Sequence, residues 1–204
     1  LGGAEPFRLG AERKPAAKTA LDIVIDRERE NISALYEAFD ARVFAKAVQM
    51  LRQASEVLVA GTRSTAPLAY HLSFALSKIA IPARRLARVT SETYDDLSRV
   101  QGRACMVVIG FPRYLRELVE LLQFAQARKL RTLAITDSAF SPLRADVNLY
   151  VPAESASFVA FHCAPLILIN ALVHTLSVAD EARTVKALNQ FEAVAEAYGY
   201  FHRE

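Results

Sequence analysis

Short apolar runs alternate with helix-like segments along most of this chain. The clearest runs are rich in Val, Ile, Leu and Ala, each stops at a residue that favours a turn, and they lie at 57–60, 105–109, 132–136 and 147–151. Runs of this length and composition are typical of strands buried on both faces of a sheet. A weaker strand is expected at 84–87.

Helical periodicity separates these runs. Leu68, Leu72 and Leu76 recur at intervals of four residues after the first run, which predicts a helix with one apolar face. The same reasoning predicts a helix after 105–109, a short helix at 92–99, an apolar helix at 156–178 and a last helix from about Asp180. The face of the helix after 105–109 carries Leu115, Leu118, Val119, Leu122 and Ala125, and that of the last helix carries Val185, Leu188, Val194 and Tyr198.

Two more helices are expected before the first strand. The apolar positions are Ile32, Leu35, Tyr36 and Phe39 in the first, and Val43, Phe44, Ala47, Val48 and Leu51 in the second, which Asp40 is expected to cap. Residues 1–20 contain Gly, Pro, Lys and Ala without periodicity, and the first residue is not Met. We interpret 1–20 as a linker and 21–204 as one domain of ordinary size.

Alternating strands and helices require crossover connections, which make neighbouring strands parallel. The pattern therefore predicts an α/β fold: a doubly wound, mostly parallel five-stranded sheet with helices on both faces. In such a sheet, ligands bind at the carboxyl ends of the strands, near the point where the strand order reverses. The residues that follow each predicted strand are accordingly the candidates for function.

Composition and charge exclude several classes of protein. The net charge is +3 and the basic residues are scattered, so direct nucleic-acid binding is not indicated. Residues 158–179 are apolar but include His162, Pro165 and Asn170, which favours a buried or interface helix over a membrane span. Cys105 and Cys163 lie in apolar runs, which predicts buried thiols in a reducing, cytoplasmic compartment. We expect neither a metal nor a cofactor, since the histidines show no ligand spacing and Gly61 stands without a glycine-rich motif.

The first strand end combines small hydroxyl residues with a cation. Residues 61–66 read GTRSTA and run directly into a helix. The N-terminus of a helix favours an anion, and Arg63 adds a fixed charge that suits phosphate or carboxylate. Thr62, Arg63, Ser64 and Thr65 are therefore candidate ligand-binding residues. In the simpler interpretation Ser64 or Thr65 only caps the helix, and we expect capping in either case.

The second strand end, residues 110–114, reads GFPRY. Arg113 stands just before a predicted helix, so it is a second candidate for contact with an anion, together with Phe111 and Tyr114. The alternative is a solvated arginine beside a phenylalanine that packs in the core. At the third end, Asp137 follows residues 132–136, and a turn capped by Asp137 is the favoured interpretation.

The fourth strand end supplies Glu154, Ser155 and Ser157 before the apolar helix. Glu154 is suited to accept hydrogen bonds from sugar hydroxyls, while the serines are candidate ligand contacts or caps. An isolated glutamate can also act as a general base. His162 is interpreted as a core histidine, and we assign no catalytic residue.

The order of these loops resembles the sugar isomerase (SIS) domain, and most closely the effector domain of RpiR-type transcriptional regulators. The resemblance covers roughly residues 30–200, and its most specific stretches are 61–66, 109–126 (IGFPRYLRELVELLQFAQ), 133–143 (LAITDSAFSPL) and 151–158 (VPAESASF). It implies a domain that binds phosphosugars, forms a homodimer or homotetramer through its helices, and controls an attached N-terminal helix-turn-helix DNA-binding domain. No such DNA-binding domain is visible in these residues.

One departure from that family affects the expected ligand. SIS domains that bind phosphate commonly carry a Ser-x-Ser-Gly-x-Thr loop where this chain has residues 109–114, which contain neither serine nor threonine. Arg113 can compensate, and a sugar acid or another carboxylate becomes an alternative to a phosphate ester. We expect a non-catalytic sensor of a small anionic carbohydrate. The alternatives are a phosphosugar isomerase that uses Glu154 or His162, and a purely structural oligomerisation domain.

Overall fold

The computed structural model describes residues 19–100, 102–155 and 162–202. Five strands form one sheet in the order β2-β1-β3-β4-β5, and all four pairings are parallel. The strands are β1 (Val57–Ala60), β2 (Ala83–Leu86), β3 (Cys105–Ile109), β4 (Arg131–Thr136) and β5 (Val147–Tyr150). The predicted fold class is confirmed, and the weak strand expected at 84–87 lies one residue earlier.

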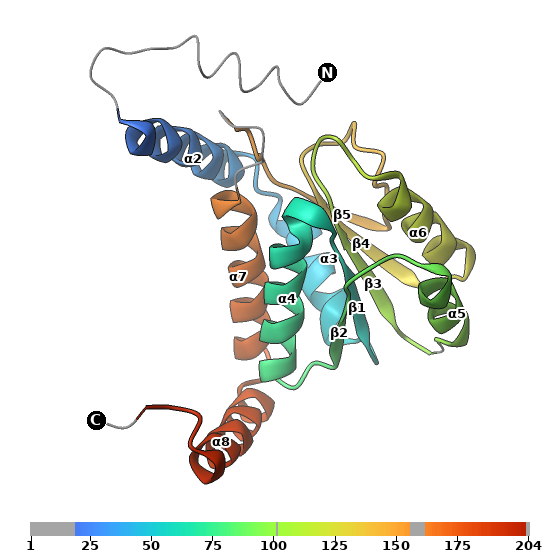
Figure 1. The fold of residues 1–204 in the computed structure, drawn as a ribbon, viewed down its shortest axis with the longest axis vertical. Helices are drawn as coiled ribbons and strands as arrows, with labels where there is room; N and C mark the ends of the chain where they lie inside the picture. Colours follow the sequence, from blue (N-terminus) through green and yellow to red (C-terminus); the bar gives the residue numbers. More distant parts are fainter. Residues whose placement is uncertain (1–18, 101, 156–161, 203–204) are drawn as a thin grey trace.

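Helices cover both faces of the sheet (Figure 1). In chain order they are α2 (Ala20–Glu37), α3 (Ala41–Arg52), α4 (Ala66–Lys78), α5 (Ser91–Arg99), α6 (Arg116–Ala127), α7 (Cys163–Val178) and α8 (Glu181–Tyr198), with a short 3-10 turn, η1 (Arg63–Thr65), before α4. Asp40 caps α3 as expected, because its Oδ1 accepts the amides of Arg42 and Val43 at 2.8 and 3.0 Å.

The inner strands β1, β3 and β4 are buried on both faces because their side chains alternate between two cores. Val57 and Val59 of β1 pack with α3, α4 and α7, whereas Leu58 and Ala60 pack with α5 and α6 on the other face. Every residue of β1 and β3 is buried. This explains why β1 and β3 are continuous apolar runs, with no alternation of polar and apolar positions.

The apolar segment near the C-terminus is a core helix. Helix α7 begins at Cys163, and residues 156–161 of the helix predicted at 156–178 lie outside the described part of the chain. Six residues of α7 are buried: Ala164, Pro165, Leu168, Ile169, Leu172 and Leu176. Among the described helices none is long and apolar enough to cross a membrane alone, although α7 and α8, bent by 103°, pass that test of length and composition as a pair.

One expectation about burial is wrong, and two of the predicted apolar helix faces are largely exposed. Cys105 is buried, but Cys163, at the first position of α7, is exposed. In α2 only Leu35 of the predicted apolar face is buried, while Tyr36 is 85% exposed. The expected face of α8 is also exposed, at Val185, Leu188, Val194 and Tyr198. These helices lie at the edge of the molecule (Figure 1), where the rest of the chain covers only part of their surface.

The start of the domain differs slightly from the expected boundary. Thr19 caps α2 through a reciprocal capping box, in which its hydroxyl accepts the Asp22 amide at 3.2 Å and its own amide binds Asp22 at 2.8 Å. Thr19 and Ala20 therefore belong to α2. Residues 1–18 of the expected linker are not described.

Candidate ligand-binding site

A cavity of about 130 Å³ lies between the loop after β1 and the loop after β3. Strands β1 and β3 are neighbours, yet the helices that follow them cover opposite faces of the sheet. This is the point at which strand order reverses, where open α/β sheets form a crevice. The lining residues are Thr62, Arg63, Ser64, Thr65, Gly110, Phe111, Pro112, Arg113, Tyr114, Leu115, Leu118 and Leu143.

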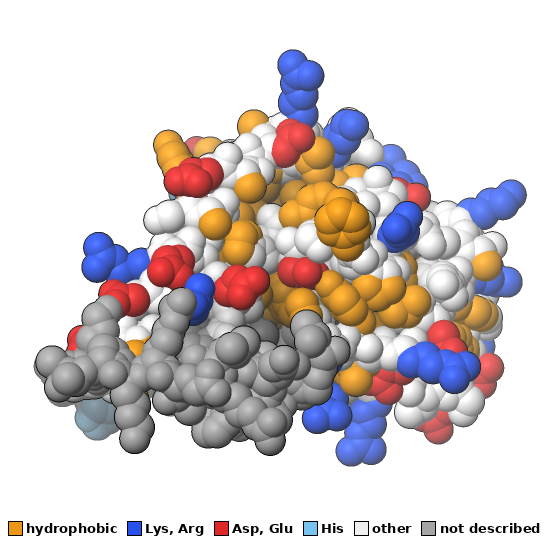
Figure 2. Space-filling view, turned by 90° about the horizontal axis from the view of Figure 1, so that it is seen from above, with side chains coloured by type: hydrophobic (Ala, Val, Ile, Leu, Met, Phe, Trp, Pro, Cys, Tyr) orange, Lys and Arg blue, Asp and Glu red, His pale blue; other side chains and the backbone are white. Residues whose placement is uncertain are grey.

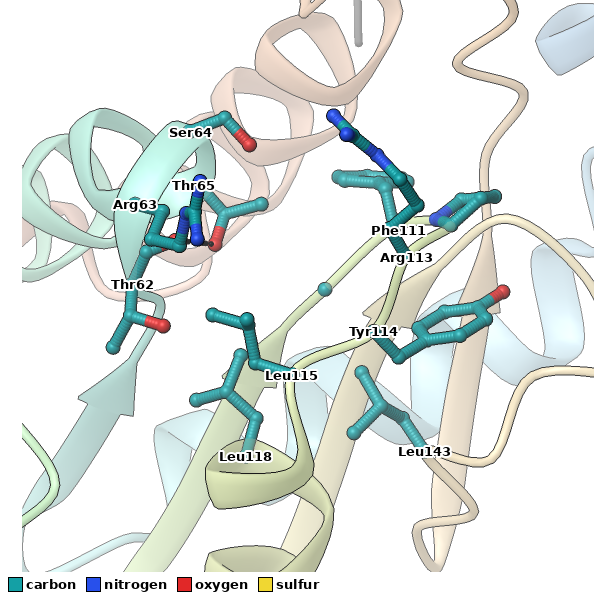
Figure 3. A pocket seen from close by; sticks show the side chains of 12 residues that line it. Thr62, Arg63, Ser64, Thr65, Phe111, Arg113, Tyr114, Leu115, Leu118 and Leu143 are labelled. Atoms are coloured by element: carbon teal, nitrogen blue, oxygen red, sulfur yellow. Dashed lines mark hydrogen bonds between the residues drawn. The ribbon is translucent and has the colours of Figure 1, made fainter. Parts of the chain in front are cut away.

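Seven of the ten candidate residues thus line one cavity. Figure 3 shows Arg63, Ser64 and Thr65 on one side, facing Phe111 and Arg113 on the other. Figure 2 looks onto this end of the molecule, where apolar side chains gather near the middle and Lys and Arg side chains project at the edge. The structure thus brings the two predicted loops together at one cavity. Anion binding by these loops stays a prediction.

The first loop is held tightly against β3. A Cβ atom at Gly61 would lie 2.9 Å from the carbonyl oxygen of Thr65, so the turn requires glycine. The Thr65 hydroxyl lies 3.0 Å from the carbonyl oxygens of both Thr62 and Ile109. The expectation that Ser64 or Thr65 caps the helix is wrong, because Thr65 directs its hydroxyl to these carbonyls and no side chain caps η1 or α4.

Thr62 connects the first loop to the second. Its side chain is buried, and its hydroxyl donates a hydrogen bond of 2.9 Å to Oε1 of Glu117, in the first turn of α6. The proton of Thr62 is therefore committed to Glu117, and only the oxygen lone pairs remain for a ligand. We regard Thr62 as a residue that holds the two loops at a fixed separation.

Both arginines of the cavity have a left-handed backbone. The φ angle is 52° at Arg63 and 68° at Arg113. A residue with a Cβ atom rarely adopts positive φ, and such conformations cluster at functional sites, where surrounding contacts maintain them. Both side chains are exposed at the cavity, and the side chain of Arg63 has no hydrogen bond or ion pair with any residue that the structure describes. Two cations therefore converge on one small hollow.

Asp137 anchors the second loop to the end of β4. Its Oδ1 accepts a short hydrogen bond from the Tyr114 hydroxyl and another of 3.2 Å from the Thr136 hydroxyl. Its Oδ2 accepts a hydrogen bond of 3.1 Å from the Ser138 hydroxyl. Burial, and then the hydrogen bond to Asp137, raise the pKa of Tyr114 to about 12. Tyr114 is accordingly a stable donor at neutral pH. The predicted role of Asp137 as a turn cap is replaced by this bond between loops.

The fourth strand end lies outside the cavity. Glu154 is exposed and Ser155 half-buried, and neither lines the cavity. Ser157 lies outside the described residues. His162 is half-buried, and its ring centroid is 6.2 Å from that of Phe111, which does line the cavity. Burial lowers the pKa of His162, with the charge of Glu28 opposing that shift.

The sequence reasoning missed two polar residues near this end. Glu28 and Asn31 are buried on α2, with exposed fractions of 8% and 2%. A sequence signal for their burial did exist, because Glu28 and Asn31 precede Leu35 at intervals of three and four residues and therefore lie on the same face of the helix. The side-chain amide of Asn31 donates to the carbonyl of Glu154 at 2.9 Å and accepts the amide of Glu154 at 3.1 Å. Glu28 accepts the Cys163 amide at 3.1 Å.

Comparison with known proteins agrees with this architecture. An uncharacterized HTH-type transcriptional regulator of Caldanaerobacter subterraneus is 25% identical over 134 residues, which make up 65% of this chain and 47% of the regulator. The chain thus spans about half the length of the curated relative that it matches.

Solved structures share the fold at lower identity. The sugar isomerase domain of the RpiR transcription factor from Sphaerobacter thermophilus matches with a TM-score of 0.83 at 24% identity, covering 86% of this chain and 99% of that one. Vibrio vulnificus NanR, complexed with ManNAc-6P, matches with a TM-score of 0.77 at 15% identity, covering 90% of this chain and 71% of that one. Phosphoheptose isomerase GmhA from Neisseria gonorrhoeae matches with a TM-score of 0.62 at 20% identity, covering 78% of this chain and 99% of that one.

The family assignment follows from the sequence itself. The model of the SIS domain matches residues 50–175, which include all five strands and the cavity between β1 and β3. This confirms the resemblance inferred from the loop motifs. The chain belongs to the SIS domain family.

Proposed function

We propose that this chain is the ligand-sensing part of a transcriptional regulator and binds a small anionic carbohydrate, a phosphosugar or a sugar acid. The observation that carries this proposal is the convergence of Arg63 and Arg113 on one cavity at the switch point of the sheet. Guanidinium groups bind phosphate and carboxylate through paired hydrogen bonds. Ser64, exposed beside Arg63, adds a hydroxyl group to the same wall.

The rest of the cavity suits a polar ligand that has an apolar face. Phe111 and Leu143, both buried, form part of the wall and can pack against a carbon skeleton. The hydrogen bond between Tyr114 and Asp137 holds the second loop in place and involves neither arginine. NanR, which shares the fold, was solved with ManNAc-6P, so the architecture is compatible with a sugar phosphate.

The regulatory half of the proposal concerns DNA. The curated relative is an HTH-type regulator about twice as long as the segment that matches, and the RpiR structure is also a transcription factor. The chain would then contact DNA only through a separate helix-turn-helix domain, in the cytoplasm and as a homodimer or homotetramer. Ligand binding would favour one arrangement of the subunits and so change the spacing of the DNA-binding domains.

A phosphosugar isomerase is the second candidate. It is favoured by the fold shared with phosphoheptose isomerase and by His162, a neutral imidazole that packs against the cavity residue Phe111. Glu154, the other expected proton carrier, is exposed and does not line the cavity. An isomerase requires an acid and a base that converge on the substrate, whereas the charged side chains on this cavity are both arginines.

Thermal unfolding in the presence of small anions tests the sensor function. The panel includes ManNAc-6P, 6-phosphogluconate, gluconate, acetate and inorganic phosphate. A ligand that binds the folded chain raises its stability by mass action, so at least one sugar phosphate or sugar acid should raise the melting temperature in a concentration-dependent way. Arg63→Ala and Arg113→Ala should each weaken that binding about tenfold or more, whereas Arg52→Ala, on α3 and far from the cavity, should not.

The anion site is refuted if no member of the panel raises the melting temperature, or if both cavity variants bind as well as the Arg52→Ala control. The isomerase alternative has its own readout. Conversion of an aldose phosphate into its ketose by the purified chain, lost in Glu154→Gln or His162→Gln, would make the chain an enzyme.

A further inference from the structure

Two of the three buried side chains of helix α2 are polar. Its three buried side chains are Glu28, Asn31 and Leu35, which lie on one face at intervals of three and four residues. Only Leu35 is apolar, whereas α7 buries six residues, all of them apolar. An element with so few buried apolar contacts is held weakly and can shift at low cost in free energy. The position of α2 therefore depends on what Glu28 and Asn31 bind.

These two side chains hold both ends of one segment. Asn31 pairs with the amide and the carbonyl of Glu154, just after β5. Glu28 accepts the amide of Cys163, the first residue of α7. The partners are 123 and 135 residues away in the sequence. One turn of α2 thus fixes where the chain leaves β5 and where it enters α7.

His162, at the described start of this region, lies close to a cavity residue. His162, which precedes Cys163, packs its ring against Phe111, and Phe111 lines the cavity. Contacts lead from the cavity through Phe111 to His162, and the next residue, Cys163, donates its amide to Glu28. Contact alone does not establish coupling, which also requires an element with two arrangements.

A second arrangement is suggested by two buried polar atoms that lack partners. Within the described residues, neither Oε2 of Glu28 nor Nε2 of His162 has a hydrogen-bond partner. A buried polar atom without a partner raises the free energy of the conformation that contains it. A movement of His162 that allows its imidazole to donate to Glu28 would satisfy both atoms and would supply the second arrangement that coupling requires.

We propose that Glu28 and Asn31 are positioning residues through which occupancy of the cavity changes the position of α2. This inference rests on the proposed function, since it assigns the regulation of that site. A ligand that contacts Phe111 shifts His162, and the hydrogen bonds of Glu28 and Asn31 transmit the shift to α2. Because residues 1–18 run directly into α2, any part of the protein that precedes them is joined to the element that moves.

Hydrogen exchange measured by mass spectrometry tests this route on the full chain, with ManNAc-6P as the probe and inorganic phosphate as the comparison. In the wild type, ManNAc-6P should slow amide exchange both in the loops at 62–66 and 110–115 and in α2. A change of about fivefold or more in α2 would lie in the ordinary range of coupling between sites. In Asn31→Ala and Glu28→Ala the loops should still be protected, but α2 should no longer respond.

Matched variants separate transmission from general damage. Glu28→Gln keeps an oxygen acceptor for the Cys163 amide and should restore the response of α2. Glu30→Ala, on the exposed side of the same helix, should respond like the wild type. Exchange in α6, on the opposite face of the sheet, reports whether each variant remains folded.

A measurement without ligand completes the test. Phe111→Leu removes the ring that touches His162 and should change the exchange of α2 in the wild-type background but not in Asn31→Ala, a non-additive result. Additive effects, or an α2 that responds to ManNAc-6P equally in Asn31→Ala, would overturn the inference. If neither ManNAc-6P nor phosphate protects the two loops in the wild type, the proposed site fails, and the Phe111 and Asn31 cycle then decides the coupling separately.

Discussion

The phenolic hydroxyl of Tyr114 donates a hydrogen bond to Oδ1 of Asp137, which ties the loop after β3 to the end of β4. Tyr114 follows Arg113 directly, so this bond limits where the arginine can lie. We expect Tyr114→Phe to lower the free energy of unfolding by about 0.5–1.5 kcal/mol, the usual net value of one hydrogen bond. It should also weaken anion binding, because the Arg113 loop becomes less ordered. Urea unfolding and titration with the best anion measure the two effects.

Tyr150→Phe is the matched control, since Tyr150 is 44% exposed on β5 and its hydroxyl forms no hydrogen bond with the described part of the chain. It should change neither quantity. Equal behaviour of the two variants would show that the Tyr114 bond does not order the loop.

The left-handed backbone at Arg113 predicts that glycine and alanine at this position differ in stability but not in anion binding. Glycine adopts positive φ without the steric cost that a Cβ atom imposes. Since φ is 68° at Arg113, we expect Arg113→Gly to be more stable than Arg113→Ala by about 1 kcal/mol, although both lose the cation and bind anions equally poorly. Urea unfolding of the two variants gives the difference. An Arg113→Ala variant that is as stable as Arg113→Gly would show that the backbone conformation is not strained.

The two cysteines should differ in reactivity. Burial raises the pKa of Cys105 to about 12, so this thiol is both inaccessible and protonated. Cys163 is exposed, although burial and the Glu28 carboxylate raise the pKa of its thiol as well. Because the thiolate is the reactive form, we expect slow labelling of Cys163 alone in the native protein and of both thiols in denaturant. Cys163→Ser should remove the native reaction, whereas fast native labelling of Cys105 would contradict the structure.

His162 predicts a loss of stability in mild acid. Burial lowers its pKa below the ordinary value of 6.5, so the unfolded chain takes up a proton that the folded chain excludes. The free energy of unfolding attributable to this group is intact above about pH 6.5 and falls as the pH drops below it. His162→Phe should therefore lose less stability than the wild type between about pH 7.5 and pH 5.5. His202→Phe, exposed near the C-terminus, is the control, and identical pH profiles for all three proteins would contradict the burial of His162.

The sheet was predictable because its strands are short apolar runs bounded by turn residues. The clearest example is β3, where the predicted and observed limits coincide at Cys105–Ile109. The position of the cavity was predictable for a related reason, since parallel strands place their carboxyl ends together. Arg63 and Arg113 could thus be expected to share a site although 50 residues separate them in the sequence.

Local pattern failed where the partner of a side chain lies far away in the sequence. Thr65 resembles a helix cap, but a carbonyl of β3 competes for its hydroxyl. Asn31 resembles a surface residue, but it binds the backbone of Glu154. The apolar faces predicted for α2 and α8 are largely exposed, because amphipathic periodicity shows that a helix has an apolar face but not whether the same chain covers it.

The division between a buried sheet and exposed loop tips has a consequence for how this site can diversify. Beneath the cavity, β1 and β3 are fully buried, and substitutions there disturb a close-packed interior. At the rim, Arg63, Ser64, Pro112 and Arg113 are exposed and contribute little to the core. Under the proposed function, exchanges at these four positions would change which anion the site prefers while the scaffold keeps folding.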